Sequence, residues 1–161
     1  MLIAASVATA LVAARTDARE RTIPNWCCVV LACLGLAFQL ARALIPGVVG
    51  RLAWEREVAT LLPDPVVCVL AAAVLLVLGV ALELGYRHVF GKAGMGLGDV
   101  KYLAAWATLI GPSVLLVLAA ACLAGAAFAL ARSERDFALG PWICGASCAL
   151  LALPLLASLL R

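Results

Sequence analysis

One acidic residue of this chain stands where acidic residues are rare, at the edge of a long apolar segment. Asp99 lies in the stretch GMGLGDVK, residues 94–101, and a largely apolar run follows it from Tyr102 to Ile110. A charge this close to hydrocarbon is costly unless it faces a cavity or a partner, and such residues usually serve a function. We therefore expect Asp99 to have a partner.

Asp17 is the partner that we predict for Asp99, and the pair would suit peptide hydrolysis. Two carboxylates about 3 Å apart cannot both ionise, so they share a proton. One can then take a proton from a water molecule while the other donates a proton to a substrate carbonyl. This chemistry needs no metal, serine or cysteine. Which aspartate is the acid and which the base stays open.

The glycines around Asp99 could serve the substrate. Glycine tolerates positive φ and a close backbone approach, so an extended substrate segment could lie along this loop and form main-chain hydrogen bonds with it. A flexible connector would have the same glycine spacing. A nucleotide-binding loop is disfavoured, because the spacing is not that of a P-loop. The residues in question are Gly94, Gly96 and Gly98.

The elements that must position these residues are membrane helices. Of the 161 residues, 66% are hydrophobic and 13% are charged, whereas about 25% are charged in a soluble domain. We predict one membrane-embedded domain over residues 1–161, an all-α bundle of about six transmembrane helices. The expected helices are Leu2–Ala14, Pro24–Ile45, Val66–Gly85, Asp99–Ile110, Val114–Ala131 and Trp142–Leu160, with an interfacial helix possible between residues 46 and 65.

The distribution of cations predicts the orientation of this bundle. Eight arginines and lysines fall in or beside the loops after the first, third and fifth expected helices, and four fall on the other side. Because basic loops stay in the cytoplasm, both termini are expected outside. Asp17, placed in the loop after the first helix, and Asp99, at the start of the fourth, then share the cytoplasmic rim. Glu83 competes as a partner, but we expect it to pair with Arg87 four residues on.

The composition argues against several other kinds of site. All seven cysteines lie in apolar runs without a C-x-x-C pair, and there is one histidine, so we expect no metal and no cofactor. Nothing in the charge pattern indicates a nucleic-acid partner. Membrane lipid is an expected partner, and the sequence leaves the oligomeric state open.

Two motifs resemble those of the type IV prepilin peptidases. The stretch GMGLGDVK, residues 94–101, is similar to the family signature G-x-G-D-x-K. The stretch DARERTIPN, residues 17–25, is similar to the family segment D-x-R-x-x-x-I-P-N. A third and weaker likeness is LGPW, residues 139–142, to the family's P-F-G-P-F; Ala138 stands in place of its first proline.

The resemblance implies an aspartic endopeptidase of the bacterial or archaeal inner membrane. Such an enzyme removes the basic leader of a prepilin or pseudopilin on the cytoplasmic side. The resemblance makes Asp17 and Asp99 catalytic and assigns Lys101 to lipid phosphate or substrate positioning. The motif residues Ile23, Pro24 and Asn25 would support the site. The chain lacks the cysteine-rich, zinc-binding segment of the long members, so it resembles the short, Flp-type or preflagellin-processing branch; N-methylation and the particular substrate stay open.

Two other kinds of protein remain as alternatives. A small proton- or cation-coupled transporter component would carry acidic residues at different depths of the bilayer, whereas the predicted topology puts Asp17, Glu83 and Asp99 on one rim. A catalytically silent membrane assembly factor could share the scaffold, and activity alone distinguishes it from a peptidase.

Overall fold

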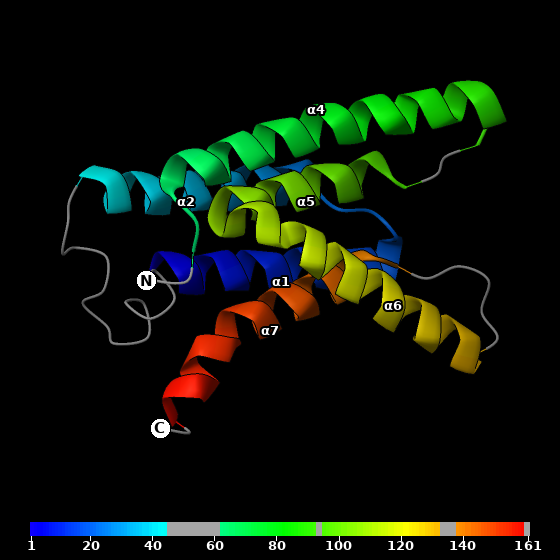
Figure 1. Cartoon of the computed structure of the whole chain (residues 1–161). Helices are drawn as coiled ribbons and strands as arrows, with labels where there is room; N and C mark the ends of the chain where they lie inside the picture. Colours follow the sequence, from blue (N-terminus) through cyan, green and yellow to red (C-terminus); the bar gives the residue numbers. More distant parts are fainter. Residues whose placement is uncertain (45–61, 93–94, 133–137, 160–161) are drawn as a thin grey trace.

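The computed structural model describes residues 1–44, 62–92, 95–132 and 138–159, and this part of the chain consists of helices and their connections, without strands. The helices form one bundle in which α1 begins and α7 ends at the same end (Figure 1). The elements are α1 (Leu2–Glu20), α2 (Asn25–Leu44), α4 (Pro65–Phe90), α5 (Leu97–Ile110), the short 3-10 turn η1 (Gly111–Ser113), α6 (Val114–Arg132) and α7 (Gly140–Leu159).

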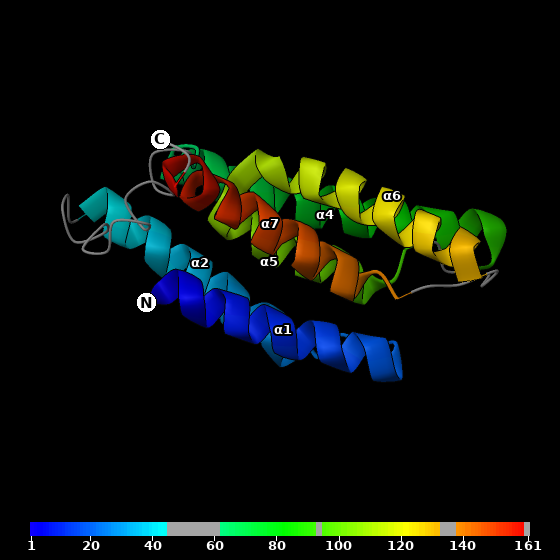
Figure 2. The same cartoon turned by 90° about the horizontal axis from the view of Figure 1, so that it is seen from below.

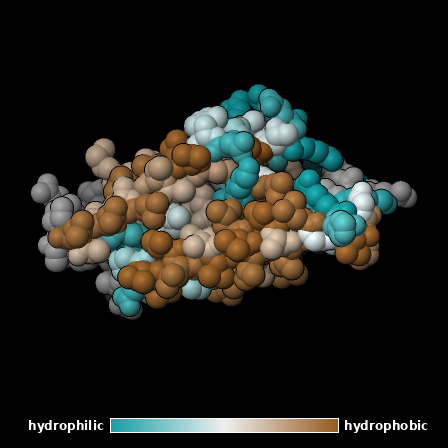
Figure 3. Space-filling model, turned by 90° about the horizontal axis from the view of Figure 1, so that it is seen from above, coloured by the Kyte–Doolittle hydropathy of each residue, from teal (hydrophilic) through white to brown (hydrophobic). Residues whose placement is uncertain are grey.

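The outer surface of this bundle suits a membrane. Within the described residues, three helical stretches are long and apolar enough to cross a bilayer: Asn25–Leu44, Pro65–Phe90 and Leu97–Arg132, the last of which contains the turn η1. Apolar residues cover most of the face seen in Figure 3, and polar residues gather mainly toward the end where α1 ends and α5 begins. The expectation of an all-helical membrane protein is therefore confirmed, while the number of spans stays a prediction.

Helix α5 is the centre of the bundle. Every residue from Tyr102 to Ile110 is buried, and α1, α2, α4, α6 and α7 surround it (Figures 1 and 2). Two outer helices approach α5 closely through glycines. A Cβ on Gly79 of α4 would lie 2.6 Å from Val100 Cγ1, and a Cβ on Gly35 of α2 would overlap the Thr108 hydroxyl. Small residues at such contacts let helices pack tightly in lipid.

The 14 residues of α5 span only about 21 Å, less than the hydrocarbon core of a bilayer. Both ends of this helix must therefore find hydrogen-bond partners inside the protein. At the C-terminal end, the buried Gln39 side chain donates to the carbonyl oxygens of Thr108 (3.2 Å) and Leu109 (2.9 Å). The N-terminal end of α5 carries Asp99 in its first turn.

Two helices, α1 and α4, continue beyond the C-terminal ends predicted for them. Helix α1 continues to Glu20 instead of ending at Ala14, so Asp17 is a helical residue. Helix α4 continues to Phe90 instead of Gly85, so His88 is also helical, and Gly91 ends the helix with a φ of 66°. The extension of α1 contains arginine, alanine and glutamate, and the extension of α4 contains arginine. These residues are good helix formers, although arginine and glutamate are charged. The interfacial helix predicted after Pro46 falls mainly on residues outside the described part.

Candidate active site

Asp17 lies in the last turns of α1, beyond its apolar part. The residue is 5% exposed, and its Oδ2 accepts a hydrogen bond of 2.9 Å from the main-chain N–H of Gly140, the first residue of α7. Burial raises the pKa of Asp17 above its ordinary value, while the Gly140 N–H and the charge of Arg21 act to lower it. Asp17 is thus a buried carboxylate whose hydrogen-bond donor is an uncharged main-chain group.

Asp99 reaches the same place from α5. It is the third residue of that helix, behind the N-cap residue Gly96, and its side chain is partly buried. The carboxylates of Asp17 and Glu83 lie near enough to Asp99 for their charges to act on it. The first turn of a helix favours a carboxylate, because its main-chain N–H groups are free and the helix dipole is positive there.

Asp17 and Asp99 line one small pocket of about 230 Å³. Its other lining residues are Arg21, Thr22, Ile23, Asn25, Gly96 and Gly98. The structure therefore brings together the C-terminal end of α1 and the N-terminal ends of α2 and α5. The prediction that Asp17 and Asp99 lie on one rim of the bundle requires this arrangement. The pocket has room for several water molecules and is lined by two carboxylates, so it can hold a polarised peptide carbonyl and an attacking water.

The two described glycines beside Asp99 have ordinary backbone conformations. Gly96 has an extended conformation with φ −60° and ψ 141°, and Gly98 lies inside α5, so neither uses the positive φ that glycine tolerates. A Cβ on Gly98 would make an ordinary van der Waals contact with Ile23, 3.5 Å from its Cβ. Gly94 lies outside the described residues. The loop that could contact a substrate backbone is therefore shorter than the glycine spacing indicated.

The remaining motif residues join α2 to α5. Lys101 Nζ donates a hydrogen bond of 3.2 Å to Asn25 Oδ1 at the exposed rim of the pocket. Pro24 immediately precedes α2, and its carbonyl oxygen accepts the N–H of Cys27 at 3.0 Å. Lys101 is therefore close to the site without contacting either aspartate through a hydrogen bond, and its role toward lipid or substrate stays a prediction.

Glu83 is buried and paired. Its side chain is 3% exposed, and its Oε1 accepts a hydrogen bond of 2.6 Å from Nε of Arg87, whose side chain is 41% exposed. This ion pair confirms the spacing argument from the sequence. Because an arginine already neutralises Glu83, Asp17 remains the better partner for Asp99.

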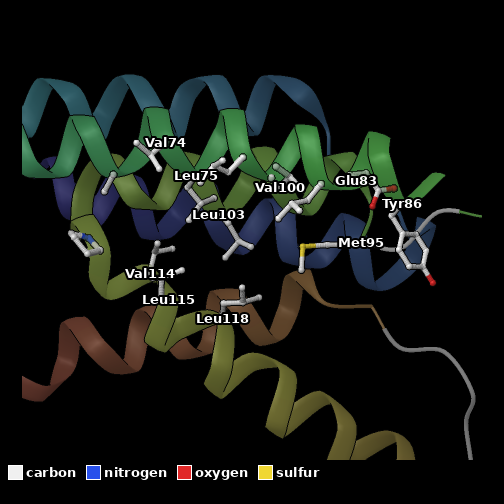
Figure 4. A pocket seen from close by; sticks show the side chains of 15 residues that line it. Val74, Leu75, Glu83, Tyr86, Met95, Val100, Leu103, Val114, Leu115 and Leu118 are labelled. Carbon is white, nitrogen blue, oxygen red and sulfur yellow. The ribbon is translucent and has the colours of Figure 1, made fainter. Parts of the chain in front are cut away.

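An apolar groove lies on the other side of the first turn of α5. Its volume is about 680 Å³, and side chains of α4, α5 and α6 point into it (Figure 4). Glu83, Tyr86 and Met95 stand together at one end of the groove. Val100 lines the groove while its neighbour Asp99 lines the small pocket. The two hollows are therefore separated by a single turn of helix.

Gly140 contacts Asp17, and the sequence did not identify it as a site residue. The weak LGPW likeness pointed to this segment, but no pattern linked it to an aspartate 123 residues earlier. In the described part of the chain, no group of three or more histidine, cysteine, aspartate or glutamate side chains could hold a metal ion. The chemistry that the arrangement offers is acid–base chemistry of two carboxylates.

One family model matches this chain. Residues 4–130 match the type IV leader peptidase family. The chain belongs to this family. The match includes both Asp17 and Asp99 but stops before Gly140. No curated protein and no solved structure matched the chain. Family membership makes the chain a leader-peptidase-type membrane protein and makes a prepilin its general kind of substrate.

Proposed function

We propose that this protein is a membrane-embedded aspartic endopeptidase that removes the leader of a prepilin or pseudopilin at the cytoplasmic face of the inner membrane. The observation that carries this proposal is the pocket shared by Asp17 and Asp99. The proposal includes six membrane-crossing helices with both termini outside. This topology agrees with α1 beginning and α7 ending at the end of the bundle opposite the site (Figure 1).

In this mechanism the two aspartates hold one proton between them when the substrate binds. The ionised carboxylate takes a proton from the water that attacks the scissile carbonyl carbon, and the protonated one donates its proton toward the carbonyl oxygen. Collapse of the tetrahedral intermediate then breaks the C–N bond as the new amine receives a proton. The apolar groove beside α5 offers a path by which an apolar substrate segment in the bilayer could reach the pocket.

The test is leader cleavage of a prepilin in lipid bilayers by the wild type and by Asp17→Asn and Asp99→Asn. Each variant removes one acid–base group, so we expect kcat to fall by on the order of 10³-fold or more. Asp64→Asn is the matched control, because Asp64 is an exposed N-cap residue at the start of α4, far from the pocket. Its rate should equal that of the wild type.

Two results would contradict the proposal. Undiminished cleavage by either pocket variant would remove that aspartate from the mechanism. A folded wild type that cleaves none of the prepilins and pseudopilins supplied would favour a silent assembly factor over a peptidase.

A further inference from the structure

We propose that the main-chain N–H of Gly140 positions the Asp17 carboxylate for catalysis, which makes Gly140 a positioning residue of this active site. This inference rests on the proposed function and extends it to the start of α7. Gly140 lies outside residues 4–130, which match the family, so the family match assigns it no role.

The first support is the hydrogen bond itself. The distance from Gly140 N to Asp17 Oδ2 is 2.9 Å, and both groups are buried. Among the described residues, this is the one hydrogen bond that the Asp17 side chain receives. A reacting carboxylate must present a defined oxygen to the water or the substrate, and misplacement by about 1 Å can cost on the order of 10²-fold in rate. The Gly140 N–H fixes which oxygen of Asp17 remains free for the pocket.

The second support is the space around this contact. A Cβ built on Gly140 would lie 2.7 Å from Asp17 Oδ2 and 3.1 Å from both Cβ and Cγ of Asp17. Any other residue would therefore push the carboxylate away from the N–H. Gly140 does not have a positive φ, so the glycine is needed here for close approach and not for backbone conformation.

The third support is electrostatic. Gly140 begins α7, a helix of 20 residues, and the free N–H groups and dipole of a helix N-terminus stabilise a negative charge. The Gly140 N–H accordingly lowers the pKa of Asp17, in opposition to burial. Among the described residues, the charged groups that interact electrostatically with Asp17 are Arg21 at the end of α1 and Asp99 of α5. Asn25, at the start of α2, also lines the pocket but is uncharged.

Gly140→Ala tests this role, with Gly145→Ala as the matched control in the same helix. A Cβ on Gly145 would have no atom within 4 Å, so this control makes the same change in open space. Cleavage of the prepilin is measured in bilayers as kcat and KM from about pH 4 to pH 9. Thermal unfolding of each variant in the same bilayers checks that it is folded.

We expect Gly140→Ala to lower kcat on the order of 10²-fold and to leave KM within about threefold, as for an interaction used in the transition state. The pH profile should move to higher pH, because Asp17 loses the N–H that lowers its pKa. Because the two aspartates titrate as a coupled pair, the shift is judged from the whole pH–rate profile and not from one limb of it.

A folded Gly140→Ala enzyme with an unmoved pH profile would overturn the proposal, whether or not kcat falls. So would a Gly145→Ala enzyme that shows the same shift. An inactive wild type would instead remove the proposed function on which this inference rests.

A second variant keeps the test valid if Gly140→Ala does not fold. An ester in place of the Leu139–Gly140 peptide bond removes the N–H without adding an atom, and an ester at the Cys144–Gly145 bond serves as its control. The first ester should move the pH profile to higher pH and the second should not; equal profiles would contradict the role of the Gly140 N–H.

Discussion

Asp17 and Glu83 are two buried acidic side chains near Asp99, and they differ in the kind of group that each one contacts. Their exposed fractions are 5% and 4%. Glu83 forms an ion pair of 2.6 Å with Arg87 on its own helix, whereas Asp17 accepts a hydrogen bond from the main chain of a distant helix. Arg87 neutralises Glu83, whereas the Gly140 N–H that contacts Asp17 carries no formal charge. Under the proposed function, the nature of the partner, and not burial alone, separates a structural acid from a reactive one.

The largest expected difference between the two acids is in catalysis. Asp17→Asn should lower kcat on the order of 10³-fold or more, because it removes an acid–base group. Glu83→Gln should keep kcat within about threefold, since Gln can still accept a hydrogen bond from Arg87 and the reaction does not use this side chain. Both rates come from the same prepilin cleavage assay at the optimum pH of each enzyme. A loss with Glu83→Gln as severe as with Asp17→Asn would mean that Glu83 is the true partner of Asp99.

The second expected difference is in stability, where the two substitutions should have opposite signs. The folded state raises the pKa of Asp17, so between the unfolded pKa and the folded pKa the native protein binds more protons than the unfolded chain. Stability from this group is then present at low pH and is lost as the pH rises. Asp17→Asn should therefore raise the midpoint of thermal unfolding at neutral pH and lose that advantage below about pH 4, near the ordinary pKa of aspartate.

Glu83→Gln should instead lower the free energy of unfolding by about 1 kcal/mol, because the Arg87 side chain is 41% exposed and water weakens the charge interaction of the pair. Thermal unfolding in detergent or bilayers at pH 4 and pH 7 measures both variants. The expected effect of Asp17 on stability is contradicted if Asp17→Asn is less stable than the wild type at neutral pH. It is also contradicted if the stability of Asp17→Asn relative to the wild type does not change with pH.

The sequence allowed the prediction of the all-helical membrane class and of the two aspartates that share a pocket, because apolar runs and short motifs carry that information locally. It misplaced the end of α1, since RTDARE was interpreted as a loop on its charge although its residues favour a helix. It also left open whether the glycines around Asp99 form a substrate-binding loop or a connector, and the structure shows Gly98 inside α5. The contact of Gly140 with Asp17 depends on how α7 packs against α1, and no local pattern encodes that packing.

The smallest expected effect concerns the charge near Asp17. Arg21 is exposed and follows α1 in the left-handed region with a φ of 52°, and its charge acts to lower the pKa of Asp17. Arg21→Asn removes the charge and keeps a residue that tolerates this conformation. The pH profile of cleavage should move slightly to higher pH, by less than in Gly140→Ala, and the shift should shrink in 0.5 M salt because exposed charges are screened.

Arg19→Asn is the control for this charge effect, since Arg19 is also exposed at the end of α1 and is not among the charges that shift the pKa of Asp17. Its pH profile should match that of the wild type at both salt concentrations. Equal shifts in the two variants would mean that Asp17 responds to the overall charge of the rim. A shift of the pH profile confined to Arg21→Asn would show that the Arg21 charge acts on Asp17 without a direct ion pair such as that of Glu83 with Arg87. The Asp17 carboxylate would then stay free for the substrate.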